Sequence, residues 1–316
     1  MIVRYLEADQ TGLLQEKIVQ AENELENCTL CPRRCGVNRQ AGERGYCGIG
    51  ALAEVASYGP HFGEESVLVG DKGSGTIFFC GCNLLCRFCQ NYEISHCLKG
   101  ECTAVNEHEL AAIMLELQAK GCHNINLVTP SHVVPQILAA LPHVIAGGLH
   151  IPLVYNCGGY ESVETLHLLE GLVDIYMPDV KFWHKDSAVQ CAKAPDYRQR
   201  VQESLLEMQR QVGDLWVNSE GVAERGLLVR HLLMPGGMEE STAIFKYLAE
   251  HISKNCYLNI MDQYRPCGKA LVIPGLEKTI TVEQYQQAIK SAEENGLTRL
   301  DQRDPLLLYE KLIITE

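Results

Sequence analysis

The stretch TIFFCGCNLLCRFCQN (residues 76–91) joins a short apolar run to four closely spaced cysteines. The run from Thr76 to about Phe79 is typical of a buried β-strand. The loop after it holds Cys82, Cys86 and Cys89, with three and two residues between them. Three close thiols suit an iron–sulfur cluster, although such clusters usually have four cysteine ligands. The spacing therefore predicts a cluster with one iron left open.

Apolar runs of the same kind recur on the C-terminal side of this loop. Segments with helical periodicity separate five further runs: NINLVTP, PLVYNC, DIYMPDVKF, GLLVRHLLMPG and YLNIMDQY. Near-continuous apolar strands that alternate with helices indicate a parallel sheet covered by helices. Six such units are too few for an eight-stranded barrel, which leaves a partial barrel or an open doubly wound sheet. In both, the loop after the first strand lies at the carboxyl edge of the sheet, where ligands bind.

The N-terminal side of the loop has a different composition. Residues 11–27 carry apolar side chains at near-helical spacing and predict an amphipathic helix. Residues 28–50 are rich in Cys, Gly and Arg, so we expect a loop that is ordered by something other than an apolar core. A second metal site, for zinc or another iron–sulfur cluster, is predicted on Cys28, Cys31, Cys35 and Cys47. Unbound thiols are the alternative.

Length and charge restrict the class of protein. The 316 residues suffice for one large α/β domain, and no run approaches the roughly 20 apolar residues of a membrane span. The N-terminus lacks the pattern of a signal peptide, so we expect a cytoplasmic protein without a membrane partner. The net charge of -13 argues against a broad nucleic-acid surface. A local basic patch is compatible with it, because one loop carries Arg33, Arg34, Arg39 and Arg44.

The 15 cysteines are expected to serve metal or redox chemistry rather than structural disulfides, because the cytoplasm is reducing. Cys80, which precedes the signature loop by two residues, is predicted to be a small buried strand residue. We expect three parts of the chain: an N-terminal helix and cysteine-rich module (1–73), the sheet with its helices (74–273), and a C-terminal helix with a packed tail (274–316).

The loop from Cys82 to Cys89, with an aromatic residue, Phe88, before the last cysteine, resembles the signature loop of radical S-adenosylmethionine (SAM) enzymes. Within that superfamily, CNLLCRFCQN, MPDVKF and VRHLLMPG are similar to the pyruvate formate-lyase activating enzyme branch, particularly its members with an N-terminal cysteine segment. The resemblance spans roughly residues 28–270. It implies a partial (β/α)6 barrel of radical SAM type with a small cysteine-rich N-terminal module.

The resemblance also implies the cofactors. Cys82, Cys86 and Cys89 would hold a 4Fe-4S cluster, whose unique iron is chelated by the amino and carboxylate groups of SAM. One electron through the cluster would cleave SAM to methionine and a 5′-deoxyadenosyl radical, which abstracts hydrogen from the substrate. No catalytic side chain is assigned, because the cofactor does the difficult chemistry.

Several positions are implied to contact SAM. Asp179 and Lys181 are two residues apart on a strand, so they project from one face, and the matching pair of the family lies near SAM. Asn156 ends the third strand, in the region from which relatives contact ribose. Phe88 would lie beside the adenine. Arg230, on the fifth strand, is a candidate for the SAM carboxylate or the substrate, and pairing inside the barrel is the alternative.

One departure from the family concerns the second strand. Relatives end this strand in a Gly-Gly-Glu element that binds the SAM amino group, whereas this chain has NLVTPSHV. Thr129 and Ser131 are the candidate contacts there, with His132 nearby. Hydroxyl groups form hydrogen bonds but do not supply the negative charge of a carboxylate.

The branch implies that the hydrogen comes from a backbone glycine of a partner protein, a glycyl radical enzyme, and that flavodoxin or ferredoxin supplies the electron. Two alternatives remain. In the first, the same radical would act on RNA or a small metabolite. The basic N-terminal loop favours this alternative, and the net negative charge of the protein opposes it. Otherwise the protein is a non-enzymatic electron-transfer or metal-binding protein. Three thiols rather than four, with Asp179 and Lys181 near them, favour an open iron with a substrate.

Overall fold

The computed structural model describes residues 2–97 and 102–301. Its centre is a curved nine-stranded sheet, in which six strands run parallel. The parallel strands coincide with the six predicted apolar runs: β2 (Ser74–Phe79), β4 (Ile125–Val128), β5 (Leu153–Cys157), β6 (Ile175–Pro178), β8 (Ala223–Leu232) and β9 (Tyr257–Met261). Strands β5, β6 and β9 are buried at every position, which explains why they are apolar without alternation.

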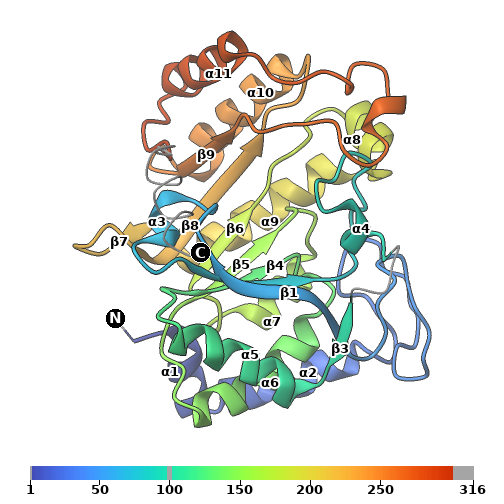
Figure 1. Ribbon diagram of the computed structural model, residues 1–316, viewed down its shortest axis with the longest axis vertical. Helices are drawn as coiled ribbons and strands as arrows, with labels where there is room; N and C mark the ends of the chain where they lie inside the picture. Colours follow the sequence, from blue (N-terminus) through green and yellow to red (C-terminus); the bar gives the residue numbers. More distant parts are fainter. Residues whose placement is uncertain (1, 98–101, 302–316) are drawn as a thin grey trace.

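The order of the parallel strands decides between the two predicted architectures. Neighbours along the sheet are β2, β4, β5, β6, β8 and β9, which is also their order in the chain. A doubly wound sheet reverses its strand order at one point, and this sheet does not. Among the described residues no pairing joins β9 to β2. The predicted partial (β/α)6 barrel is therefore confirmed, and Figure 1 shows its curvature.

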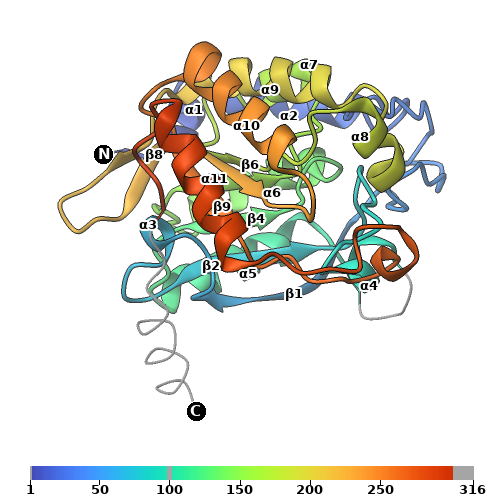
Figure 2. The same cartoon turned by 90° about the horizontal axis from the view of Figure 1, so that it is seen from above.

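Helices cover the outer face of this curved sheet, as Figures 1 and 2 show. They are α5 (Glu107–Ala119), α6 (Val134–Ala146), α7 (Val163–Leu169), α8 (Lys185–Ala192), α9 (Tyr197–Val212) and α10 (Met238–Tyr247), which continues into the π-helix η1 (Leu248–Ile252). Helix α5 begins with a capping box, in which Asn106 accepts from the backbone of Glu109 and Glu109 accepts from the backbone of Asn106. In the described ranges no helix has the length and apolarity to cross a bilayer.

The N-terminal residues contribute to the same sheet. Strand β1 (Ala53–His61) pairs antiparallel with β2, and the short β3 (Thr103–Val105) pairs with β1. Helices α1 (Arg4–Gln10) and α2 (Leu13–Asn23) contact α6, and α2 also contacts α7. A short helix, α3 (Ser66–Val69), connects β1 to β2. The division of the chain at residue 73 stays a prediction. Strand β1 lies on the N-terminal side of this boundary, whereas its partners β2 and β3 lie on the C-terminal side.

The C-terminal part agrees with the predicted helix as far as it is described. Helix α11 (Val282–Glu294) packs on α10, and a short 3-10 turn, η2 (Ala270–Val272), precedes it. The remaining elements are the short strand β7 (Trp216–Val217), beside β8, and helix α4 (Tyr92–Ser95), after the cysteine loop. The predicted packed tail, residues 305–316, lies outside the described residues.

The expectation that no cysteine forms a structural disulfide is wrong for one pair. Cys80 is bonded to Cys102, and their Cα atoms are 6.2 Å apart. Val55 of β1 pairs with Phe79 on one side and with Thr103 on the other, so the two cysteines lie beside these partners. Cys80 follows β2 and Cys102 precedes β3, and the two cysteines meet because both strands pair with β1. The spacing of cysteines along the chain does not show this arrangement. The other 13 cysteines are free.

Two buried histidines form hydrogen bonds with loop residues near the carboxyl edge of the sheet. The ring of His132 contacts the Cys80 carbonyl through Nε2 at 2.7 Å, just before the cysteine loop. The ring of His231 lies between the Val180 carbonyl, 2.6 Å away, and the Ser241 hydroxyl, 2.8 Å away. Burial lowers the pKa of both histidines to about 4. Both rings are therefore neutral at pH 7.

We expect these histidines to make the protein less stable in acid. Unfolded histidine binds a proton below about pH 6.5, whereas His132 and His231 resist protonation until about pH 4, so the free energy of unfolding falls as the pH drops between these values. Urea unfolding, followed by the fluorescence of Trp183 and Trp216, measures the fall. His231→Gln should make it shallower. An equal slope in both proteins would contradict the assignment.

Candidate functional site

A cavity of about 390 Å³ opens at the carboxyl ends of the parallel strands. Every strand of the partial barrel contributes to it, directly or through the loop that follows the strand. The sequence-predicted residues that line it are Cys82, Cys86, Phe88, Cys89, Thr129, Asn156, Asp179, Lys181 and Arg230. The fold thus brings together side chains that are up to 148 positions apart in the chain, from Cys82 to Arg230. This cavity is the candidate active site.

The cysteine loop is held in a compact shape by its backbone. Gly81 has φ +78°, and a Cβ atom there would lie 2.5 Å from the Cys47 carbonyl, so only glycine fits. The backbone N–H of Leu84 donates to the Cys82 sulfur at 3.3 Å, and the N–H of Asn91 donates to Cys89. These donors favour the thiolate form of the sulfur atoms.

Burial opposes ionisation of the same thiols. It raises the pKa of Cys82 to about 11 and also raises the pKa of Cys86 and Cys89. Without a metal the three groups are therefore neutral thiols at pH 7. Metal ligation requires the thiolate, so binding an iron–sulfur cluster here releases protons. The donor set of three thiols fits a cluster with one iron that the protein does not ligate.

An ion-pair network forms the polar side of the cavity. Asp179 accepts from the ammonium group of Lys181 and, at 2.6 Å, from Nε of Arg230. Nη2 of Arg230 donates to the Asn156 side-chain oxygen at 2.7 Å. The predicted juxtaposition of Asp179 and Lys181 is present, and Arg230 joins them. Arg230 also approaches two carboxylates, Glu64 at 3.6 Å and Glu65 at 3.9 Å.

The network keeps its groups charged although they are buried. Burial by itself would raise the pKa of Asp179, but Arg230 and Lys181 hold it below the usual range. Burial would lower the pKa of Lys181, but Asp179 and then Cys86 keep it above the ordinary value. Burial would also lower the pKa of Arg230, but the carboxylates of Asp179, Glu65 and Glu64 keep that pKa above its ordinary value. The cavity therefore holds two cations, Lys181 and Arg230, that share the ionised carboxylate of Asp179.

Phe88 and Thr129 form other parts of the wall. Phe88 is 3% exposed and packs edge-on against Phe182 and at a tilt against Tyr264, with ring centroids 6.0 Å apart in both pairs. Thr129 has φ +60°, a backbone conformation that is uncommon for a β-branched residue. Its N–H donates to the Asn156 carbonyl at 2.8 Å. This backbone strain lies at the cavity, as strain often does at functional sites.

Ser131 is not among the residues that line the cavity. Its hydroxyl donates to the buried Glu161 carboxylate at 2.6 Å, and the Tyr155 hydroxyl donates to the same carboxylate at 3.0 Å. Burial raises the pKa of Glu161 above its ordinary value. The Ser131 hydroxyl, which was predicted to contact SAM, thus bonds a carboxylate that does not line the cavity. The role of Ser131 at the site stays a prediction.

The sequence analysis missed several wall residues, above all Glu64 and His61. The Glu64 carboxylate lies 3.2 Å from Nδ1 of His61 and faces Arg230. Both residues precede α3, and this part of the chain contacts β9: Asn259 donates to Glu65 at 2.7 Å, and the hydroxyl groups of Ser66 and Tyr257 lie 3.4 Å apart. The one sign of these residues in the sequence is the acidic pair in HFGEES. This pair follows β1, an antiparallel strand that the pattern of apolar residues did not predict.

The arginines of the predicted basic patch on the N-terminal loop interact with other groups of the protein itself. Arg33 donates to the carbonyls of Asn83, Ala192 and Lys193, at 2.9, 2.8 and 2.6 Å. Arg39 is 1% exposed and donates to the carbonyls of Gly50 and His132. Arg44 pairs with Glu54 at 2.9 Å and Arg34 lies 3.9 Å from Glu164. The four arginines therefore do not form one free cationic surface.

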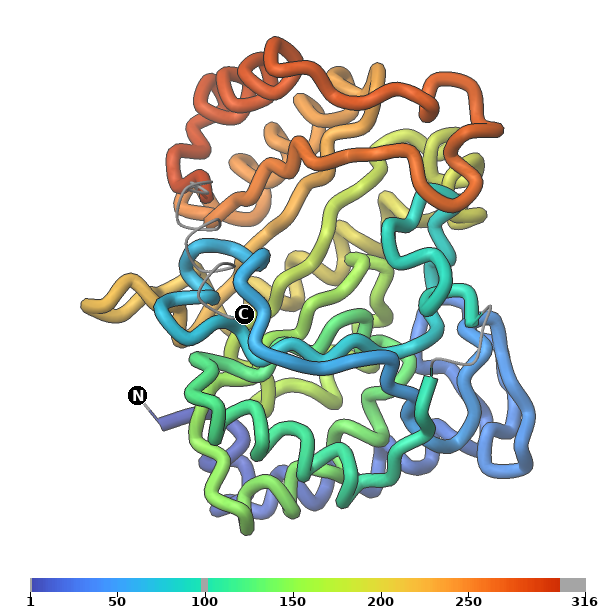
Figure 3. The backbone as a smooth tube through the Cα atoms, viewed as in Figure 1, coloured from blue at the N-terminus to red at the C-terminus, as the bar shows by residue number. Residues whose placement is uncertain are grey.

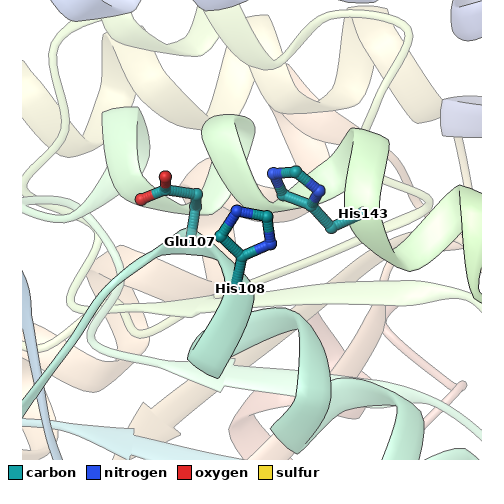
Figure 4. Close-up of side chains that lie close together, drawn as sticks. All are labelled: Glu107, His108 and His143. Atoms are coloured by element: carbon teal, nitrogen blue, oxygen red, sulfur yellow. The ribbon is translucent and has the colours of Figure 1, made fainter.

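The described residues contain one group of potential metal ligands whose atoms all lie within 4.8 Å of one another: Glu107, His108 and His143. Figure 4 shows them at the start of α5 and on the facing side of α6. Glu107 and His108 are exposed, and the group lies outside the cavity. The four N-terminal cysteines also lie outside the cavity, beside the loop that carries Cys82.

The fold and the cavity define an α/β protein with a three-cysteine site at the open edge of a partial barrel. No profile of a known protein family matches the chain. The uncharacterized protein MJ0674 of Methanocaldococcus jannaschii is 33% identical over 298 residues, which cover 92% of this chain and 82% of that protein. The chain belongs to the same family as this archaeal protein.

A solved structure described as "Native anSMEcpe with bound AdoMet" matches with a TM-score of 0.43 and 11% identity. The match covers 74% of this chain and 60% of that chain. At this score the likeness does not bear on what this protein does.

We expect Arg230→Met to destabilise the cluster-free protein by about 3–5 kcal/mol, because it removes one partner of a buried ion pair. Asp179 and Glu65 would then lose their shared cation. Chemical denaturation measures the loss, and Arg265→Met, at an exposed position, is the matched control. If both variants unfold at the same denaturant concentration as the unchanged protein, the network does not stabilise the fold.

Proposed function

We propose that this protein is a radical SAM enzyme, with a 4Fe-4S cluster on Cys82, Cys86 and Cys89 and with SAM beside it in the cavity. The observation that carries the proposal is that these three thiols line the same cavity as two buried cations, Lys181 and Arg230. When bound, the cluster supplies the electron that cleaves SAM to methionine and a 5′-deoxyadenosyl radical, which takes hydrogen from a substrate.

The charged residues give the cavity a binding site for the carboxylate of SAM. An ammonium group has three donors, and Lys181 uses one of them on Asp179. Its remaining donors bond no other described residue, and Lys181 lines the cavity, where a ligand carboxylate would form strong charge-assisted hydrogen bonds. Asp179, which Arg230 also holds, fixes the position of Lys181. Asn156 is in turn oriented by Arg230 and presents its amide to the cavity.

The apolar wall and the strained strand end complete the proposed site. Phe88 is locked between Phe182 and Tyr264, so it offers a fixed aromatic surface to the adenine. Thr129 lies where relatives carry the Gly-Gly-Glu element, and its hydroxyl is the proposed contact of the SAM amino group. Glu64, farther along the wall, is a carboxylate that balances the positive charge of Arg230.

An electron-transfer protein is the competing interpretation, and it would need a fourth cysteine on the cluster. Cys267 is the candidate for that ligand, because it lies near enough to Cys89 to add to the effect of burial in raising the pKa of that thiol. It is not among the residues lining the cavity. In the radical SAM proposal Cys267 is not a ligand, so the two interpretations differ in what a Cys267 variant does.

We expect Cys82→Ala, Cys86→Ala and Cys89→Ala each to abolish deoxyadenosine formation from SAM under reducing, anaerobic conditions, because each removes one of three ligands. Cys267→Ala is the matched control and should keep both the cluster and the activity. Iron and sulfide content and chromatography of the products measure the two effects. Loss of the cluster in the Cys267 variant, with no deoxyadenosine from the unchanged protein, would favour the electron carrier.

For the substrate we propose a backbone glycine of a partner protein, with a low-potential carrier such as flavodoxin or ferredoxin as the electron donor. The support is the similarity of CNLLCRFCQN, MPDVKF and VRHLLMPG to the activating enzyme branch. The RNA alternative loses its motivation, because the arginines of the N-terminal loop bind carbonyl and carboxylate groups of this chain.

If this substrate is right, the reconstituted enzyme with SAM and a reductant should generate a glycyl radical in an anaerobic extract of its own source cells. Electron paramagnetic resonance (EPR) would show the doublet of a glycyl radical, and the Cys86→Ala protein is the control. Steady deoxyadenosine formation without a protein radical, while a small molecule in the extract is consumed, would contradict a protein substrate.

A further inference from the structure

We propose that Cys28, Cys31, Cys35 and Cys47 ligate a second iron–sulfur cluster rather than a zinc ion. This site lies outside the cavity described above and does not depend on what the cavity binds. Figure 3 traces the segment that carries these cysteines, from the end of α2 to the start of β1. The segment has no helix or strand of its own.

The four sulfur atoms are brought into one region by a folded loop. The N–H of Cys28 donates to the Val37 carbonyl, and the Cys28 carbonyl accepts from Gly36, each at 3.0 Å. Cys35 is thereby next to the residues hydrogen-bonded to Cys28, and its sulfur lies 3.3 Å from the backbone nitrogen of Tyr46, which precedes Cys47. All four are free thiols, although the structure forms a disulfide elsewhere.

Backbone donors point at these sulfur atoms in the same way as in the cavity. The backbone N–H groups of Arg33 and Ile49 lie near the sulfur atoms of Cys31 and Cys47, two residues beyond the cysteine in each case. The pairs Cys82–Leu84 and Cys89–Asn91 repeat this spacing. Hydrogen bonds to the sulfur atoms of a cluster stabilise thiolate ligands and tune their potential.

Cys35 receives its donor from the other side of the loop, where the Tyr46 N–H lies 3.3 Å from the sulfur. Gly45 is essential to this approach, because a Cβ atom there would lie 2.9 Å from the same sulfur. Three of the four sulfur atoms therefore have a backbone N–H group close by.

The spacing of the sulfur atoms argues against zinc. A tetrahedral zinc ion with Zn–S bonds of about 2.3 Å holds its sulfur atoms about 3.8 Å apart. Within the described chain, the ligand group that lies within 4.8 Å is Glu107, His108 and His143, and no three of these cysteines meet that limit. The Cys82 set does not meet it either. Neither cysteine set therefore has the close spacing that a single zinc ion imposes on its ligands.

A buried arginine supplies a further sign of a missing ligand. Two nitrogens of the Arg39 guanidinium bind carbonyl groups, but the third, Nη2, is buried and has no hydrogen-bond partner among the described residues. An unpaired buried donor on a charged group is costly. The charge of Arg39 acts on Cys47. A cluster carrying four thiolates is negative, so its sulfur atoms would both accept this donor and offset the charge.

The two cysteine sites touch each other through their backbones. Gly81, which precedes Cys82, packs on the Cys47 carbonyl. Arg33 donates to the Asn83 carbonyl and places its guanidinium 4.0 Å from the ring centre of Tyr46. The second cluster would therefore lie next to the loop of the first.

The test uses a protein in which Cys82, Cys86 and Cys89 are all replaced by alanine and which is reconstituted anaerobically with iron and sulfide. We expect it to retain iron and acid-labile sulfide in equal amounts, with no zinc. Adding Cys31→Ala should remove both, whereas adding Cys122→Ala, at a buried thiol outside both sites, should not. Because the first site is absent from every variant, the result does not depend on SAM chemistry.

Zinc without sulfide in the triple variant would overturn the proposal, as would a folded variant whose four N-terminal thiols are freely alkylated. If the triple variant does not fold, iron is counted in the unchanged protein and in Cys31→Ala. We expect more iron than a single 4Fe-4S cluster holds in the former, and only the iron of that one cluster in the latter. Equal iron in the two proteins would contradict a second cluster.

Discussion

The shared use of Asp179 by Lys181 and Arg230 is the interaction on which the geometry of the cavity depends. A buried carboxylate is stable only when it is paired, and here two cations from different positions along the edge meet it. Arg230 extends the pairing to Asn156 and toward Glu64. The ends of three neighbouring strands are thereby fixed relative to one another. Without the carboxylate, two positive charges would repel each other beside the cysteine loop.

The cysteine loop depends in turn on the N-terminal segment. Arg33 binds the Asn83 carbonyl inside the loop, and the chain at Cys47 packs against Gly81. Residues 28–50 have little apolar surface, and ordering a residue costs about 1–2 kcal/mol in backbone entropy. The cluster proposed for its four cysteines would offset that cost, because metal-binding free energy becomes folding free energy. The proposal therefore links order in the first site to metal in the second.

The sequence predicted the parts of the site that depend on local pattern. Six apolar runs became six parallel strands, and this order of strands brought Cys82, Asp179 and Arg230 to one edge. What it did not predict depends on contacts between distant segments. The disulfide of Cys80 arises because β1 lies between two strands, and Glu64 reaches the cavity because α3 contacts β9. Residue spacing carries no information about either contact.

The central claim is that the cluster and SAM occupy one cavity, and EPR of the reduced cluster tests it most directly. The account predicts that adding SAM changes the EPR spectrum of the protein, and that SAM labelled with ¹⁷O in its carboxylate or ¹⁵N in its amino group shows hyperfine coupling to the cluster. To separate the two cysteine sites, the measurement is repeated on the protein in which Cys82, Cys86 and Cys89 are replaced by alanine, whose spectrum should not respond to SAM. A spectrum of the unchanged protein that is identical with and without saturating SAM would contradict the account.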